Sequence, residues 1–391
     1  MVHNSRVLQN QRMNNRISVF ERHPYAITKP STEKSRWQTY VKGSDKRKIV
    51  RAATYDKLIE KLFDFYFGQA GSGSMTMDAL FREWLSYKES ITDSMKTIRR
   101  HEQHWNKYFE LWREKKVTSY DRLDLQKACN LLVRDNNLSS KEWQNIKTIL
   151  SGMFEYAYEK KYIAENPMPQ VKIMVKYRQV NKKTGVTETY RSDELLKILH
   201  YLDSEYARTG DIVLLAVKFD FFVGLRVGEL VSLKWDDVLD IKNLHVRREE
   251  TKVSFRDGGV WKEEYQVVEH TKTHSDRIIP LVPAAISLLN DIRIKAPCGT
   301  SEDDFIFVRD GKRITARQIN YALEKACVKL GIPVKRSHKI RKTVASRLNA
   351  GNVPLDCIRE LLGHSNLNTT LGYIYNPLSE KETYNLMARA L

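Results

Sequence analysis

The sequence has few cysteines and no long apolar run. Its four cysteines, Cys129, Cys298, Cys327 and Cys357, stand alone, and no two of them form a CxxC pair. This spacing argues against structural zinc and against a disulfide framework, and it fits a reducing cytoplasm. No stretch approaches the roughly 18 apolar residues that a membrane span requires, and the first residues contain no apolar signal core. We therefore expect a protein that does not cross a membrane.

Acidic residues are also in deficit. The chain has 66 Lys and Arg against 48 Asp and Glu, which gives a net charge of +18 and a pI of about 9.5. The basic residues occur in every region, and such an excess favours a polyanionic partner. With 391 residues, 41% of them hydrophobic, the chain is long enough for two or three domains that each have a core.

Residues 1–68 divide into a polar stretch and a small basic module. Residues 1–35 are rich in Asn, Arg and Gln without periodicity, so we expect them to be disordered or to order on binding. Alternating residues on both sides of a Gly43–Asp45 turn predict a β-hairpin, and a helix follows up to Phe67. This hairpin could lie in a DNA groove through Arg36, Lys42, Lys46, Arg47 and Lys48, although a merely solvated basic hairpin remains the alternative.

A Gly/Ser-rich linker at residues 69–74 leads to a helical region at residues 75–167. Aromatic and aliphatic residues recur there at helical spacing in four stretches, and Ser139 with Glu142 resembles an N-terminal capping box. We expect an all-α domain with these aromatics in its core. Basic residues between them could follow DNA phosphates, namely Lys96, Arg99, Arg100 and Lys147. Residues 168–190 lack periodicity and are predicted to be a second linker.

The last predicted domain, residues 191–391, is mainly helical with a small antiparallel sheet. A nearly continuous apolar helix breaks at Gly224, and a new helix follows. Arg226 is flanked by apolar residues there and should be largely buried, so it needs a partner, for which Glu229 is one turn away. One strand is predicted at residues 244–247. Two more should be joined at residues 272–275, with Lys272 at the hairpin, where a lone lysine is usually only solvated.

The segment from Ser337 to Tyr375 carries the densest set of chemical side chains. His338 and Arg341 are three residues apart, so they share a helical face and can present a donor and a positive charge to one anion. A second helix ends at Gly363 before His364. Tyr373 then follows a small polar stretch, although a tyrosine in such a place is often only packed. After residue 378, a capping box begins a short apolar helix.

Six of these residues, in this order, resemble the pattern of the tyrosine recombinase (phage integrase) family. They are Arg226 in GLRVGEL, Lys272 in TKTHSDRIIPL, His338 and Arg341 in HKIRKT, His364 in LLGHS, and Tyr373 in TTLGY. The interval between the LGH motif and the tyrosine is the one that the family uses, and it favours Tyr373 over Tyr375. In the first two domains the resemblance rests only on the order of the predicted domains, a hairpin module followed by a helical domain.

The resemblance implies a multidomain α+β protein with an arm-binding hairpin module, an all-α core-binding domain and a mainly helical catalytic domain. It implies that Tyr373 attacks a DNA phosphodiester while two arginines, Arg226 and Arg341, hold the phosphate oxygens. In the same scheme Lys272 protonates the departing 5′ oxygen, His338 takes the tyrosine proton, His364 donates to the phosphate, and Glu229 supports the site. Rigid guanidinium donors can carry the developing charge, so neither a metal ion nor a cofactor is expected.

The partners implied by the resemblance are double-stranded DNA with core and arm sites, and further copies of the chain. We expect a homotetramer on two duplexes, with an excisionase or DNA-bending accessory protein. The C-terminal helix is expected to dock on a neighbour, and the alternative is that it closes its own domain. The implied reaction integrates or excises a mobile element through a Holliday junction, in the nucleoid of a bacterial cytoplasm. Two alternatives stay open: a type IB topoisomerase that relaxes supercoils, and a non-catalytic DNA-binding regulator on the same scaffold.

Overall fold

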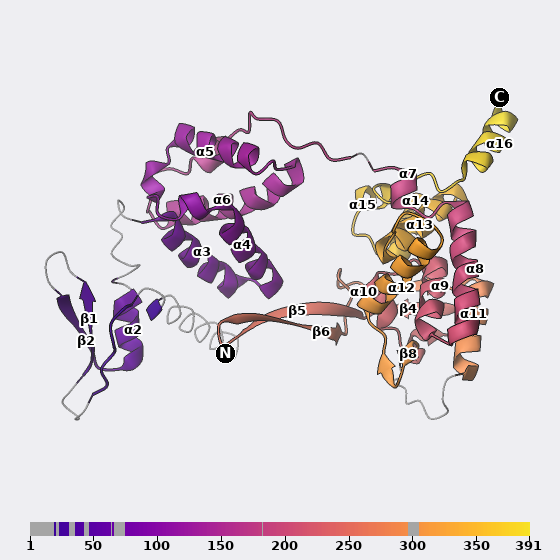
Figure 1. Cartoon of the computed structure of the whole chain (residues 1–391), viewed down its shortest axis with the longest axis horizontal. Coiled ribbons are helices and arrows are strands. Elements are labelled where there is room, and N and C mark those ends of the chain that lie inside the picture. Colours follow the sequence, from indigo (N-terminus) through magenta and orange to yellow (C-terminus); the bar gives the residue numbers. More distant parts are fainter. Residues whose placement is uncertain are drawn as a thin grey trace. The chain divides into compact units, whose positions relative to one another are not determined.

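The computed structural model describes residues 19–20, 23–30, 36–42, 47–63, 65, 75–181, 183–295 and 305–391. Contacts divide the chain into two compact units, shown in Figure 1. The first comprises Met1–Val180 with Val253–Glu263, and the second comprises Asn181–Lys252 with Glu264–Leu391. The fold is a mostly helical α+β arrangement with small antiparallel sheets, as predicted.

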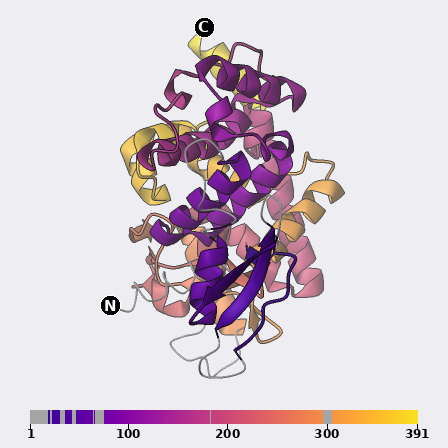
Figure 2. The ribbon, with the colours of Figure 1, turned by 90° about the vertical axis from the view of Figure 1, so that its left-hand side faces the viewer.

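The N-terminal module is the predicted hairpin followed by a helix. Strand β1 (Trp37–Lys42) pairs antiparallel with β2 (Arg47–Ala52), and Figure 2 shows the two strands side by side. Helix α2 (Tyr55–Phe63) adds Leu58, Ile59 and Leu62 to a small core that also includes Val19. Residues 1–18, the turn at 43–46 and the linker at 69–74 lie outside the described residues, so the predictions for them, including Lys46, have no structural counterpart here.

The helical region of the first unit has four main helices around an aromatic core. They are α3 (Met77–Ile91), α4 (Met95–Tyr108), α5 (Arg122–Asp135) and α6 (Ser140–Glu159), with short 3-10 turns η2 (Glu110–Trp112), η3 (Val117–Ser119) and η4 (Met168–Gln170). The ring of Trp105 stacks on Phe81 at 4.3 Å between centroids and on Phe109 at 4.7 Å. The predicted capping box of Ser139 and Glu142 begins α6.

The second unit is built around α9 (Ile212–Val223). This helix is almost wholly apolar and is therefore buried on most of its surface. It contacts α8 (Ser192–Thr209), α11 (Pro283–Lys295), α12 (Ala316–Lys329) and α13 (Ser337–Ala350). The remaining helical elements are α7 (Gly185–Glu188), α10 (Val227–Val231), η5 (Trp235–Asp237), α14 (Leu355–Leu362), α15 (Leu367–Leu371) and α16 (Glu380–Ala390).

The strands from residue 238 onwards form separate small sheets. Strands β3 (Val238–Leu239), β4 (Asn243–Val246) and β7 (Arg277–Pro280) make one sheet in the order β3-β4-β7, and β4 confirms the first predicted strand. Strands β5 (Glu249–Asp257) and β6 (Val260–Val268) form a ribbon of their own. A last pair joins β8 (Val308–Arg309) to β9 (Lys312–Arg313).

The prediction of a hairpin closed at residues 272–275 is wrong. Strand β6 pairs with β5, and β7 pairs with β4, so Lys272 lies on a connection between two different sheets. The reason is that the hairpin turn lies upstream, between β5 and β6. Gly258 and Gly259 both have positive φ there, 58° and 84°, as a tight hairpin turn requires. This glycine pair was the sequence signal that could have revealed β5.

None of the helices within the described ranges has the length and apolarity needed to span a bilayer.

Candidate active site

A buried carboxylate, Glu229, lies at the centre of the site. Gly224 ends α9 with φ 65°, and a Cβ on it would meet the Val344 side chain at 3.0 Å, so a glycine is needed for the turn into α10. The backbone N–H of Arg226 then donates to Glu229 Oε2 at 2.9 Å, and Arg226 Nη1 donates to Oε1 at 2.7 Å. The predicted Arg226–Glu229 pair is present. The arginine side chain is 23% exposed, so it is less buried than its apolar neighbours suggested.

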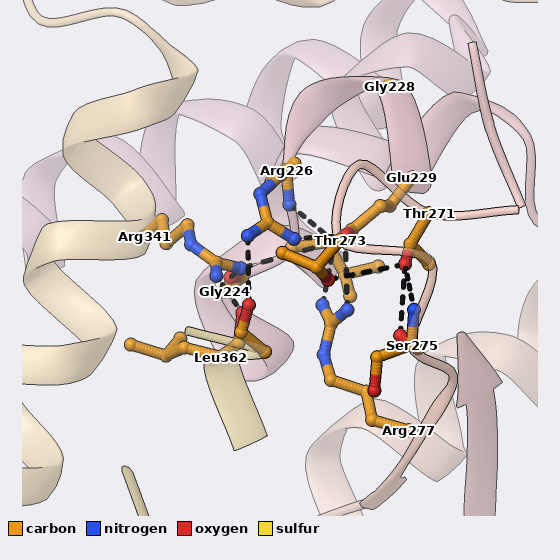
Figure 3. A network of polar contacts seen from close by, with 12 residues as sticks. Gly224, Arg226, Gly228, Glu229, Thr271, Thr273, Ser275, Arg277, Arg341 and Leu362 are labelled. Atoms are coloured by element: carbon orange, nitrogen blue, oxygen red, sulfur yellow. Dashed lines mark hydrogen bonds and ion pairs between the residues drawn. The ribbon is translucent and has the colours of Figure 1, made fainter. Parts of the chain in front are cut away.

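Arg341 reaches the same carboxylate from α13. Its side chain is buried, its Nη1 donates to Gly224 O at 2.9 Å, and its Nη2 donates to Leu362 O. Arg341 Nη1 lies 4.0 Å from Glu229 Oε2 (Figure 3). Its Nε has no hydrogen-bond partner among the described residues. Burial lowers the pKa of Arg341 to about 10 against the opposing effect of Glu229, so the guanidinium remains charged near neutral pH.

The acidity of Glu229 follows from the arginines around it. Burial by itself would raise its pKa, but hydrogen bonds from Arg277 and the charges of Arg277, Arg341 and Arg226 lower it to about 2. A buried charge is tolerated only when it is paired and hydrogen-bonded in this way. The carboxylate therefore stays ionised and holds several positive charges close together.

Sequence reasoning missed Arg277, the first residue of β7. Its side chain is 7% exposed, and its Nη1 and Nη2 donate to the two oxygens of Glu229 at 3.0 and 2.6 Å. Its Nε donates to Leu361 O at 2.8 Å. The only signal in the sequence was a basic residue shortly after Lys272 in the same segment, and a lone arginine at a strand end is usually solvated.

His364 follows Gly363, which ends α14 in the left-handed conformation as predicted. The ring is buried, and its Nδ1 lies 3.0 Å from Thr370 Oγ1. Its Nε2 has no partner within the described part of the chain. Burial, followed by the charges of Arg341 and Arg226, lowers the pKa of His364 to about 3.

We expect the His364 ring to remain neutral at pH 5 in the DNA-free protein. Its pKa in the folded state is about 3, below the value of about 6.5 for an unfolded chain, so its contribution to the free energy of folding is lost as pH falls from 6.5 towards 3. Ring-nitrogen NMR shifts recorded from pH 7 to 4 measure this directly, with His364→Gln to assign the signal. A ring that titrates near pH 6.5 would contradict the expectation.

Tyr373 lies between two histidines. It follows α15, which begins where the Asn366 side chain accepts from the N–H of Thr369. Its ring centroid is 5.1 Å from that of His338 and 4.5 Å from that of His364, both edge-on. Tyr375 is nearby as well, because Ser346 Oγ donates to Tyr373 O and accepts from Tyr375 N.

His338 is exposed at the edge of the site. Surrounding protein atoms nevertheless desolvate part of its ring, and this effect, with the charges of Lys342 and Arg341, lowers its pKa to about 4. A neutral imidazole can accept a proton, which a general base requires. Five of the six residues singled out in the sequence, Arg226, His338, Arg341, His364 and Tyr373, thus meet in one site.

Lys272, the sixth residue, is exposed on the connection between β6 and β7. The loop is closed by buried Thr271, whose Oγ1 donates to Ser275 O at 2.9 Å and accepts from Ser275 N at 3.3 Å (Figure 3). Burial, followed by the charge of Glu229, raises the pKa of nearby Glu249 against the opposing charges of Arg226, His270 and Lys272.

The proposed DNA-contacting residues are mostly exposed. Arg36, Lys42, Arg47 and Lys48 are exposed on or beside the β1–β2 hairpin, and Arg47 also lies over the Tyr25 ring at 5.1 Å. In the helical region, Lys96 and Arg100 are exposed and Lys147 is half-buried. Arg99 differs, because its guanidinium is paired with Glu263.

The model of the phage integrase family matches residues 188–382. Among curated proteins, the chain is 29% identical to a XerC-like tyrosine recombinase of Caldanaerobacter subterraneus, over 80% of this chain and 81% of that protein. It is 26% identical to the prophage ps2 probable integrase of Lactococcus lactis, over 94% of each chain.

Two solved structures share the fold. The Tn1549 transposon integrase in complex with a circular intermediate DNA aligns with a TM-score of 0.60 at 18% identity, over 81% of this chain and all of that one. The lambda integrase tetramer bound to a Holliday junction aligns with a TM-score of 0.57 at 14% identity, over 90% of this chain and 97% of that one.

Proposed function

Since this chain belongs to the phage integrase family and is a tyrosine-type site-specific DNA recombinase, we propose that it integrates or excises a mobile element through a covalent 3′-phosphotyrosine at Tyr373. The observation that carries the proposal is the set of side chains around the Tyr373 phenol. Its ring contacts His338 and His364, and Arg341 Nε and His364 Nε2 are buried nitrogens without a partner among the described residues. A phosphate oxygen is a suitable acceptor for such donors.

In the proposed step, the Tyr373 oxygen forms a bond to phosphorus while the bond from phosphorus to the 5′ oxygen breaks. His338 accepts the phenol proton, and Lys272 supplies a proton to the departing oxygen. Negative charge grows on the nonbridging oxygens, where Arg226 and Arg341 donate and His364 adds a hydrogen bond. The phosphotyrosine keeps the energy of a phosphoester. A 5′ hydroxyl of another strand can therefore reverse the step without ATP, which converts cleavage into strand exchange.

We assign DNA binding to the two N-terminal parts of the chain. The hairpin module would contact arm-type sites and the helical domain core-type sites, with residues 168–190 running between the helical and catalytic domains. Exposed basic side chains on both parts support this assignment, because they can neutralise phosphates. The lambda integrase tetramer on a Holliday junction is a precedent for the assembly. An excisionase or a DNA-bending protein would complete it.

The test places two assays side by side with purified protein, the ends of its own element and excess chelator. We expect recombinant products and protein attached to 3′ DNA ends, because the proposed site carries its charge on arginines. Relaxation of supercoils without recombinants would instead indicate topoisomerase activity. DNA that is bound but never covalently attached would indicate a regulator and would contradict the proposal.

The C-terminal helix α16 is proposed to dock on a neighbouring copy. Tyr384, Leu386 and Met387 are 71%, 53% and 56% exposed, and short helices need packing to be stable. Deleting residues 379–391 should weaken cooperative assembly of the paired-DNA complex and leave the melting temperature unchanged. Gel shift and sedimentation measure the assembly, with Lys381→Ala on the same helix as control. Unaltered recombination, or a large loss of thermal stability, would argue against docking in trans.

A further inference from the structure

We propose that Arg277 is a positioning residue of this recombinase, which holds the phosphate-binding arginines and His364 in the geometry needed for cleavage. The inference rests on the proposed covalent mechanism. In the structure, Arg277 joins three parts of the site: the carboxylate of Glu229, the end of α14, and the loop that carries Lys272.

The first connection is to Glu229. Three guanidiniums lie around this carboxylate, and the two nitrogens of Arg277 each donate to a different oxygen (Figure 3). Arg226 donates from its side chain to only one of the oxygens, and Arg341 stays 4.0 Å away. A bidentate pair sets the plane of the carboxylate as well as its charge. Arg277 therefore orients the group against which Arg226 is aligned.

The second connection is to the end of α14. The last carbonyls of a helix have no partner within the helix. Here three arginines each donate to one of three consecutive carbonyls. Arg277 Nε donates to Leu361 O at 2.8 Å, Arg341 Nη2 to Leu362 O, and Arg226 Nη2 to Gly363 O at 3.0 Å. The residue after these carbonyls is His364. The arginine cluster thus fixes the helix end from which this histidine projects.

Close packing reinforces that connection. A Cβ on Gly363 would lie 3.1 Å from Arg277 Nη1 and 3.2 Å from its Cδ. Gly363 also has φ 61°, which favours glycine. The Arg277 side chain therefore lies directly against the peptide that precedes His364, where a shorter side chain would leave space for that turn to move.

The third connection runs along the backbone. Thr271 closes the Lys272 loop through Ser275, and Arg277 begins β7 after the single intervening residue Asp276. Its backbone pairs with Val246 of β4, while its side chain is held by Glu229. The downstream end of the Lys272 loop is consequently attached to the same carboxylate as the arginines. A displacement of about 1 Å at such a site can reduce a rate roughly 100-fold.

The test compares Arg277→Gln, Arg277→Lys and the wild type on a nicked suicide substrate under single-turnover conditions. We expect Arg277→Gln to cleave about 100-fold more slowly at saturating protein, with little change in the concentration that half-saturates cleavage. Arg277→Lys should recover only part of this rate, because an ammonium cannot reproduce the two-pronged contact with Glu229. The lysine variant keeps the charge, so it remains informative where the glutamine variant folds poorly.

A second substrate separates positioning from general stability. Replacing one nonbridging oxygen by methyl makes the phosphate neutral, so the reaction depends less on aligned arginines. The deficit of Arg277→Gln should shrink several-fold on this substrate. Arg313→Gln is the matched control, since Arg313 also pairs with a buried glutamate, Glu250, at 2.7 Å. It should change the melting temperature and leave cleavage by folded protein unchanged on both substrates.

Three results would overturn the role of Arg277. The first is a wild-type cleavage rate for Arg277→Gln, and the second is a wild-type cleavage rate for Arg277→Lys. The third is a loss of cleavage rate that parallels the loss of melting temperature in both Arg277→Gln and Arg313→Gln and that has the same size on the two substrates. A wild-type protein that never forms the adduct would be a different failure, because it would refute the proposed function itself.

Discussion

Replacing Tyr373 with Phe should abolish the covalent protein–DNA adduct on a nicked suicide substrate while leaving DNA binding intact. The substitution removes only the phenolic oxygen, which is the proposed nucleophile. The aromatic ring and its contacts with His338 and His364 remain, so the surrounding site should keep its shape. Adduct on a denaturing gel and affinity in a gel shift are the two measurements.

Tyr375→Phe is the matched control for that experiment. The Tyr375 ring lies 5.1 Å from Lys342 Nζ, and the Tyr373 ring lies 5.5 Å from the same atom, so both tyrosines are near the same cation. Only Tyr373 has a ring contact with both histidines among the described residues. We expect Tyr375→Phe to form the adduct. The reverse pattern, with adduct in Tyr373→Phe and none in Tyr375→Phe, would move the nucleophile to Tyr375.

Replacing Arg226 with Lys should slow cleavage by about 10²- to 10³-fold, the usual cost of removing one donor that stabilises a transition state. Lysine keeps the positive charge, so DNA affinity should change little. Its three donors share one nitrogen, so they cannot reproduce the planar arrangement in which Nη1 of Arg226 donates to Glu229 and Nη2 donates to Gly363 O. Single-turnover cleavage at saturating protein, compared with gel-shift affinity, separates these two effects.

Arg359→Lys provides the control for the arginine substitution. Arg359 lies on α14, but its side chain pairs with Asp356 and Glu360 rather than with Glu229. Its replacement should leave the cleavage rate unchanged, since neither carboxylate belongs to the site. A wild-type rate for Arg226→Lys would remove Arg226 from the set of residues that bind the reacting phosphate.

Features with a local signal were predicted well. Gly224 and Gly363 end their helices, and Ser139 and Ser379 begin theirs with capping boxes, as their sequences indicated. These features depend on residues within one or two turns of the chain, so a short window contains their cause. The hairpin at residues 272–275 was predicted wrongly because β7 pairs with β4, which lies outside such a window, while the Gly258–Gly259 turn pairs β6 with β5.

The sequence by itself determined which family the chain resembles and which side chains are candidates for the chemistry, because residue type and order are local properties. Only the tertiary structure decided that Arg226, Arg277 and Arg341 share one carboxylate, that of Glu229. Arg277 lies 48 positions from Glu229 and 84 positions from Leu361, and it meets both through the packing of α10, β7 and α14. Burial of Glu229 is the physical reason for this arrangement. An ionised carboxylate that is shielded from water needs several hydrogen-bond donors, and it orients those donors in return.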